Sequence, residues 1–284
     1  MPVQALLLII VAAVAHSVWN LLAKRAAKHN NFIWFASALE AALFLPAAAW
    51  AIWVSWDRLG SRAAVFLLAT GLLHLLYTDS LLRGYRAGDY SLVYPVARGT
   101  GPLLSFVGAL VFLGERPSLT AFAGVLLVVL GILLLSGFAA AGALSWPALF
   151  WGVATGVIIA GYTLVDAYSV KVLLLSPILV EYAGNFVRLI LLSGSTLRKR
   201  PSLAAEWRLC WKEAAGVAVL TPAAYILVLI AMRIAPVSHV APAREMSMMM
   251  GAYLGARLLS EPHFARRLTA SALIAAGVAA LAVG

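Results

Sequence analysis

The sequence predicts an all-α integral membrane protein in which ten transmembrane helices form two inverted five-helix repeats. This prediction rests on the composition, on ten apolar segments and on an internal repeat. Of the 284 residues, 63% are hydrophobic and 11% are charged, whereas soluble domains are about 45–50% apolar and about 25% charged. A soluble fold of this size cannot bury so much apolar surface, so we expect lipid to surround the chain.

The apolar residues fall into ten consecutive segments. A helix needs about 20 apolar residues to cross a bilayer, and the segments have roughly this length. They cover residues 3–23, 32–54, 63–82, 90–113, 119–138, 147–169, 176–196, 214–232, 237–259 and 264–283. Because the connections are short, little chain is left for a domain outside the membrane, and the lipid bilayer is the main partner that the sequence predicts.

The basic residues predict the orientation. If the loop between the first two segments is cytoplasmic, the cytoplasmic loops hold twelve Lys and Arg residues and the outer loops hold five. Cytoplasmic loops carry such an excess, so both termini are predicted outside, in a multi-pass protein of the bacterial inner membrane. The same distribution explains the net charge of +10 without a nucleic-acid partner. The single cysteine, Cys210, excludes an internal disulfide framework.

An internal repeat emerges when the chain is shifted against itself by 146 residues. Arg98 then aligns with Arg244, Glu115 with Glu261 and Asn20 with Asp166. Because matches in separate helix pairs share one offset, we predict two repeats, residues 1–141 and 142–284. Five helices per repeat is an odd number, so the second repeat enters the membrane inverted. Transporters commonly have inverted repeats, with the substrate bound near the bilayer midplane where the repeats meet.

Short motifs add a family resemblance to this repeat. Glu115-Arg116-Pro117 and Glu261-Pro262 close helices in the two halves, and the first segment contains His16-Ser17-Val18-Trp19-Asn20-Leu21-Leu22-Ala23-Lys24. With these motifs the chain resembles the EamA-type drug/metabolite transporter superfamily over essentially its whole length. Within the superfamily it is most similar to the YddG-type exporters of aromatic and other amino acids.

The resemblance implies a secondary transporter that exports amino acids, aromatic ones included, or related small metabolites by alternating access. Such proteins bind substrate in a central cavity lined by both halves. One alternative is an exporter of other small molecules or drugs in the same fold. A second is an intramembrane lipid-modifying enzyme. The enzyme is disfavoured because no nucleophile lies in a recognisable motif and no His pair has metal-ligand spacing on a helix. We therefore predict no enzyme activity, no cofactor and no metal, in a monomer.

Polar and aromatic residues of the third segment predict part of the substrate cavity. Thr70, His74, Tyr77 and Thr78 lie on one stripe of a helix whose other faces are rich in leucine. Lipid does not favour a histidine and a tyrosine, so we expect the stripe to face a wet cavity; the alternative is a local hydrogen bond of His74 to a neighbouring helix. The predicted cavity residues are Trp19, His74, Tyr77, Thr78, Tyr94, Tyr162, Tyr225 and Met246.

Charged residues within the segments predict a buried network, because a charge at mid-bilayer costs at least about 2.5–3.5 kcal/mol. Its predicted members are Asn20, Arg98, Asp166 and Arg244. By the repeat, Arg98 is expected to pair with Asn20, and Arg244 with Asp166, either to fix helix register or to contact substrate. Glu245 is expected to point elsewhere. Glu40, Glu181 and Arg188 are expected to pair with one another.

Prolines predict where helices break. Proline removes a backbone hydrogen bond and kinks a helix, which lipid tolerates only where protein or a cavity covers the gap. The predicted breaks are at Pro95, Pro102 and Pro242. Glycines spaced four apart, as in Gly152 and Gly156, predict close contacts between helices of the bundle.

Overall fold

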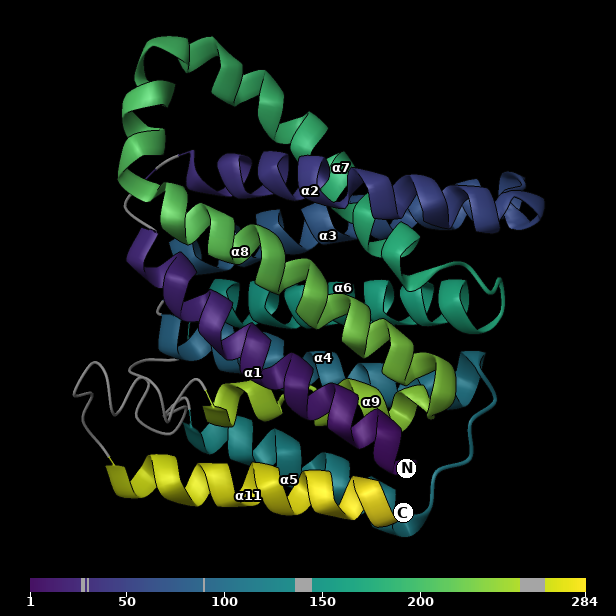
Figure 1. The fold of residues 1–284 in the computed structure, drawn as a ribbon. Helices are drawn as coiled ribbons and strands as arrows, with labels where there is room; N and C mark the ends of the chain where they lie inside the picture. Colours follow the sequence, from purple (N-terminus) through teal and green to yellow (C-terminus); the bar gives the residue numbers. More distant parts are fainter. Residues whose placement is uncertain (27–28, 30, 89, 136–144, 251–263) are drawn as a thin grey trace.

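The structure, a computed structural model, describes residues 1–26, 29, 31–88, 90–135, 145–250 and 264–284. These residues form helices and turns and contain no strand, which confirms the predicted all-α class. Figure 1 shows the helices α1 (Val3–Ala26), α2 (Phe32–Val54), α3 (Ser61–Ala87), α4 (Tyr90–Phe112), α5 (Leu119–Leu135), α6 (Trp146–Lys171), α7 (Pro177–Thr196), α8 (Arg200–Ile234), α9 (Val237–Ala243) and α11 (Phe264–Val283). Short 3-10 turns, Trp56–Arg58 and Leu197–Lys199, follow α2 and α7.

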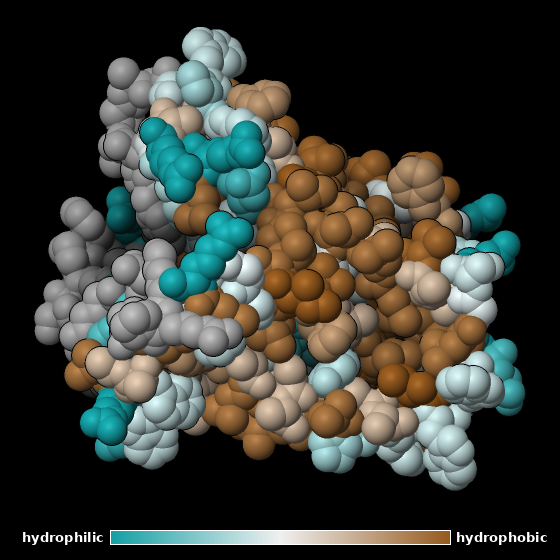
Figure 2. All heavy atoms as spheres, turned by 90° about the horizontal axis from the view of Figure 1, so that it is seen from above, coloured by the Kyte–Doolittle hydropathy of each residue, from teal (hydrophilic) through white to brown (hydrophobic). Residues whose placement is uncertain are grey.

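Several helices have the length and composition of membrane spans. Within the described part of the chain, six qualify: α1, α2, α3, residues 92–112 of α4, α6 and residues 203–234 of α8. Residues 119–135 and 268–283 form shorter apolar helices. The space-filling view shows a broad apolar surface with hydrophilic residues towards its two ends (Figure 2). The protein is therefore a multi-pass membrane protein.

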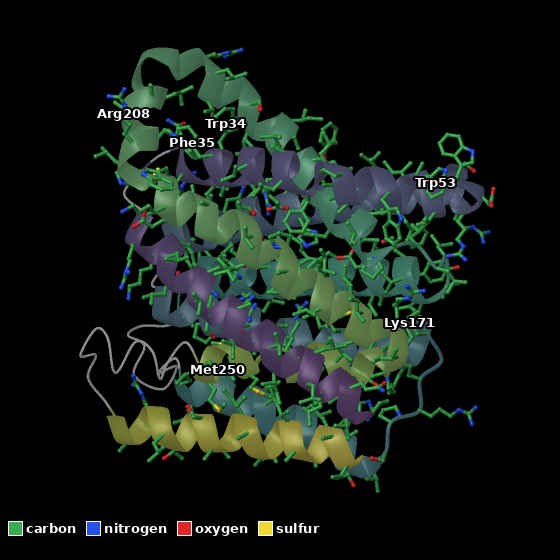
Figure 3. All side chains as sticks on the ribbon, viewed as in Figure 1. Trp34, Phe35, Trp53, Lys171, Arg208 and Met250 are labelled. Carbon is green, nitrogen blue, oxygen red and sulfur yellow. The ribbon has the colours of Figure 1, made fainter. Side chains whose placement is uncertain are left out.

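The two chain ends lie together at one end of the bundle. The N-terminal amine of Met1 donates a hydrogen bond to the carbonyl of Ala282 at 2.7 Å, and Figure 1 shows both ends beside each other. Lys171 and Trp53 lie at this same end, whereas Trp34 and Arg208 lie at the opposite end (Figure 3). Residues that the sequence assigns to opposite membrane faces thus lie at opposite ends of the helices.

Small residues bring the helices close together. α6 packs against both α3 and α4, and α1 packs along α8. A Cβ atom added to Gly156 of α6 would lie 2.6 Å from Cβ of Thr100 in α4, so these backbones approach closely. α5 and α11 pack in the same way, because a Cβ on Gly124 would lie 2.8 Å from the carbonyl oxygen of Gly277. Such contacts are typical of helices that associate in lipid.

Two predicted helix breaks are wrong. α4 runs without interruption through Pro95 and Pro102. α6 packs tightly against this part of α4, since a Cβ on Gly152 would lie 3.0 Å from Cβ of Val96 and one on Gly156 would lie 2.6 Å from Cβ of Thr100, so protein and not lipid lies beside the proline-containing stretch. The third predicted break does lie near its proline, because α9 ends at Ala243, one residue after Pro242. Residues 244–245 then form a turn, and helix resumes at Met246. The predicted span 237–259 lies partly outside the described residues.

Candidate functional site

The turn after α9 places two neighbouring charged residues in the bundle interior. Glu245 forms a salt bridge with Arg98 of α4, and its other oxygen lies 3.5 Å from Nε of Arg244. The Glu245 side chain is 1% exposed and each arginine side chain 11%. The three side chains carry one net positive charge. This arrangement corrects two predictions: among the described residues, the carboxylate partner of Arg98 and of Arg244 is Glu245, which was expected to point elsewhere.

The backbone departs from a regular α-helix at Arg244 and Glu245. In an unbroken helix neighbouring side chains point about 100° apart. Here the amide of Arg244 donates to the carbonyl of Val240, but that of Glu245 donates to the carbonyl of Pro242, three residues back. The regular α-helix therefore ends where Arg244 and Glu245 lie, and helical spacing alone does not predict that Arg98, Arg244 and Glu245 meet.

Three aromatic rings from α3, α6 and α8 pack beside these charges. The ring of His74 stacks on that of Tyr162 at 4.2 Å and meets Tyr225 edge-on at 5.7 Å. The guanidinium of Arg244 lies 5.7 Å from the Tyr162 ring centroid and donates a hydrogen bond to the Tyr162 hydroxyl at 3.4 Å. Tyr77 packs edge-on against Tyr162 at 6.0 Å. Stacking and cation–π contacts of this kind add to the burial of the rings.

Asp166 lies one turn after Tyr162 on α6 and is fully buried. It accepts a hydrogen bond from the Tyr225 hydroxyl through Oδ2, whereas its Oδ1 has no hydrogen-bond partner among the described residues. The Nδ1 atom of His74 is 2.9 Å from the carbonyl oxygen of Thr70. A carbonyl only accepts, so this nitrogen carries the ring proton. Asp166 is thus bound by Tyr225 of α8, whose ring contacts His74 beside Tyr162.

We refer to these residues as the central cluster: His74, Arg98, Tyr162, Asp166, Tyr225, Arg244 and Glu245. It has a cationic pole at the two arginines, an anionic pole at Asp166 and aromatic rings between them. His16 of α1 has Arg98 and Arg244 as charged neighbours, and its ring meets that of Trp19 at 4.9 Å. Among the described residues, Nε of Arg98 and Nε1 of Trp19 are buried donors without a hydrogen-bond partner.

The comparison with known families decides the broad identity. Residues 3–137 match the family model described as the EamA-like transporter family. This stretch of the chain belongs to the EamA-like transporter family. The family resemblance predicted from the sequence is confirmed, and with it the broad function, transport of small molecules across a membrane. Membership of a transporter family also agrees with the prediction that the protein is not an enzyme.

Comparison with solved structures supports the same fold across the whole chain. One solved structure, titled only "Crystal structure of protein", covers 100% of this chain and 98% of its own, with a TM-score of 0.74 and 18% sequence identity. At this identity the similarity shows the fold alone. The search of curated proteins finds no match.

The structure brings together only part of the predicted site. The central cluster contains His74, Tyr162 and Tyr225, and Tyr77 packs against Tyr162. Tyr94 is a neighbour of Arg98 and Tyr77. The ring of Trp19 contacts that of His16, which has Arg98 and Arg244 as charged neighbours. Thr78 is exposed and donates its hydroxyl hydrogen to the carbonyl of His74. Met246 is 8% exposed and packs in the hydrophobic core.

Of the predicted charge network, Asn20 lies outside the cluster. It is exposed, and its amide donates to the carbonyl of His16 one turn earlier. The sequence analysis missed Glu245 as the partner of both arginines. Charge balance is a signal that points to it, because two arginines buried in a membrane need a carboxylate nearby. No described residues form a group of three or more metal-binding side chains.

A second polar contact closes the bundle at the end that holds Lys171. The carboxylate of Glu115, after α4, accepts hydrogen bonds from the amides of Val237 and Ser238 at 2.7 and 2.8 Å. It also lies 3.3 Å from Nζ of Lys171. Burial raises the pKa of Glu115, but the Ser238 hydroxyl, the two amides and the Lys171 charge outweigh it and hold that pKa below its ordinary value. Glu115 is therefore charged at neutral pH and ties α4 to α6 and α9.

Proposed function

We propose that the protein is a secondary transporter that exports amino acids, aromatic ones included, from the bacterial cytoplasm across the inner membrane by alternating access. The observation that carries the proposal is the central cluster, in which two arginines and a buried carboxylate lie among aromatic rings. An α-amino acid carries the complementary charges, a carboxylate and an ammonium group. Its carboxylate would bind at Arg98 and Arg244, and its ammonium group at Asp166.

The aromatic rings and the unpaired donors support the same substrate class. His74, Tyr162 and Tyr225 offer ring faces and edges on which an aromatic or apolar side chain can pack. Buried donors normally have partners, so Nε of Arg98 and Nε1 of Trp19, which lack one within the described chain, are suited to donate hydrogen bonds to a substrate carboxylate. Cofactors have no part in this proposal, and one copy of the chain holds the whole cluster.

Helix packing supports alternating access between two inverted repeats, residues 1–141 and 142–284. The offset of 146 residues relates Gly124 to Ala270 and Gly131 to Gly277. A Cβ on Gly124 would meet Gly277, and a Cβ on Gly131 would meet Ala270. The offset therefore converts the contact between residues 124 and 277 into the contact between residues 270 and 131, as a two-fold relation between the halves requires. The contact of α3 with α6 has its counterpart in that of α8 with α1.

The proposed orientation places both termini outside. The end of the bundle that holds the termini and Lys171 would then face away from the cytoplasm, and the end with Arg208 would face it. The basic residues of the loops favour this orientation. Glu115 would act on the outer side, where its bonds to α9 and Lys171 hold the two halves together.

A binding experiment tests the substrate class. Thermal unfolding of the purified protein is measured with phenylalanine, with phenethylamine, which lacks the carboxylate, and with 3-phenylpropionate, which lacks the ammonium group. We expect phenylalanine to stabilise the protein, and loss of either charge to weaken binding at least about tenfold, because a buried charged group is left without its partner.

The result would contradict the proposal if both analogues bound as tightly as phenylalanine. Glycine, leucine and threonine are measured in the same way to compare other amino-acid side chains. A neutral sugar is the control for a solute that has neither a carboxylate nor an ammonium group. Stabilisation by organic cations or sugars, without any by amino acids, would favour the alternative exporter of other small molecules.

A further inference from the structure

The first turns of α8 extend beyond the part of the helix that lipid can cover. α8 has 35 residues, so it is about 52 Å long at about 1.5 Å per residue, whereas the hydrocarbon core of a bilayer is about 30 Å thick. The apolar segment of the sequence begins at residue 214. Residues 200–213 therefore lie at the membrane surface, at the end of the bundle that holds Arg208. Figure 1 shows these turns at the edge of the bundle beyond α2, where they turn away from the direction of the other helices.

One side of this extension packs against the start of α2. Cys210 is buried in a hydrophobic cluster with Phe35, and the Phe35 ring lies 5.3 Å from that of Trp207. The Glu206 carboxylate accepts hydrogen bonds from the backbone amide and the side-chain amide of Asn31, at 3.2 and 2.5 Å. The inner side of the extension thus consists of apolar contacts and a carboxylate that already has donors.

The outer side carries basic and large apolar side chains. Successive residues of a helix are about 100° apart, so Arg208, Leu209, Trp211 and Lys212 each point at least about 100° away from the buried Cys210. Leu209 is 70% exposed and Trp211 47%, and Arg208 and Lys212 are exposed as well. Figure 3 shows Arg208 at the outer edge of the segment. We refer to these four outer residues as the basic face.

The charges of the basic face are not neutralised within the described chain. No described residue forms a salt bridge with Arg208 or Lys212. Nζ of Lys212 lies 5.7 Å from the centroid of the Trp211 ring, and the nearby Glu206 is bonded to Asn31 on the inner side. The extension therefore separates its charges, with the bonded carboxylate towards the bundle and the two cations away from it.

We propose that the basic face binds anionic phospholipids of the surrounding membrane. Arg208 and Lys212 bind the lipid phosphates, and Leu209 and Trp211 lie at the boundary with the acyl chains. Helices at membrane surfaces combine basic and apolar side chains in this way, and tryptophan is enriched at that depth. The exposed leucine and tryptophan favour lipid over an acidic protein as the partner, because the apolar part of α8 follows directly. The proposal is independent of the solute that the protein transports.

Quenching of tryptophan fluorescence by brominated lipids tests the contact. The full chain is reconstituted in phosphatidylcholine vesicles that contain a fixed fraction of either phosphatidylglycerol or phosphatidylcholine brominated in the upper part of the acyl chains. The signal of Trp211 is the difference between proteins with and without Trp211→Phe. We expect brominated phosphatidylglycerol to quench Trp211 more strongly than brominated phosphatidylcholine. Salt at about 1 M should remove the difference, because it screens the attraction.

Variants of the two cations test which side chains attract the anionic lipid. Arg208→Gln combined with Lys212→Gln should lower the preference for phosphatidylglycerol, by up to about fivefold for each positive charge removed. Arg208→Lys combined with Lys212→Arg keeps both charges and should keep the preference. The matched control is Arg62→Gln combined with Arg116→Gln, which removes two exposed charges at the Lys171 end and should leave the quenching of Trp211 unchanged.

Three results would overturn the proposal. The first is equal quenching of Trp211 by the two brominated lipids in the wild type. The second is a preference for phosphatidylglycerol that survives when both Arg208 and Lys212 are replaced by glutamine. The third is no quenching of Trp211 by either lipid, which would place the basic face in water and favour a soluble acidic protein as its partner.

Discussion

Glu245→Gln is expected to destabilise the protein by roughly 3–5 kcal/mol, the usual cost of removing one partner from a buried ion pair. Both Arg98 and Arg244 would lose their carboxylate, and their side chains are nearly as buried as Glu245 itself. Glutamine fills almost the same volume and can still accept hydrogen bonds, so the loss of stability would come from the lost charge and not from a cavity. We also expect the variant to lose amino-acid transport, because two unpaired arginines would bind any available anion.

The measurement is the midpoint of thermal unfolding of the purified protein in detergent. Asp79→Asn is the matched control, because it breaks an ion pair with Arg83 that is 53% exposed on both sides. Exposed pairs contribute about 0–1 kcal/mol, so its midpoint should stay close to that of the wild type. Adding Arg98→Gln to Glu245→Gln should restore part of the stability. A midpoint for Glu245→Gln equal to that of the control would refute the shared pairing.

Asp166→Asn is expected to weaken amino-acid binding by roughly 10- to 100-fold, the effect of losing one charge-assisted hydrogen bond of about 1.5–3 kcal/mol. Asparagine keeps an oxygen that can accept from Tyr225, so the bundle should remain folded. The defect should depend on the substrate. Binding of 3-phenylpropionate, which has no ammonium group, should be equally weak in the variant and the wild type.

Tyr225→Phe provides the control for this substitution. It removes the hydroxyl that bonds to Asp166 but keeps the carboxylate and the ring beside His74. We expect a loss of about tenfold or less, as for a single neutral hydrogen bond. Competition with labelled phenylalanine measures both variants. Equal affinity of Asp166→Asn and wild type for phenylalanine would show that the ammonium group binds elsewhere.

Much of the fold follows from the apolar pattern of the sequence. Predicted and observed limits agree within a few residues for most helices, because lipid requires long uninterrupted apolar runs. α8 is the main exception: it begins at Arg200, whereas the predicted segment begins at residue 214. Its first turns contain charged residues such as Arg208 and Glu213 and extend beyond the apolar segment. Hydropathy finds the membrane part of a helix but not a polar extension.

The candidate site could be predicted only in part. His74, Tyr162 and Asp166 stand out in the sequence because such residues are rare in lipid. Their partners come from elements far apart in the sequence: Glu245 lies in a turn where the helical pattern ends, and it pairs with Arg98 of α4, which no periodicity encodes. The uninterrupted α4 also depends on distant residues, since the glycines of α6 that pack against it lie far away in the sequence.

Counterflow in liposomes tests the central claim most directly. Purified protein is reconstituted with unlabelled phenylalanine inside, radiolabelled phenylalanine is added outside, and the internal label is analysed chemically as well as counted. The account predicts saturable exchange of chemically unchanged phenylalanine that is retained in Asp79→Asn and strongly reduced in Asp166→Asn. No exchange of any amino acid above that of empty liposomes would contradict the claim of amino-acid transport, and a chemically altered product would show an enzyme instead.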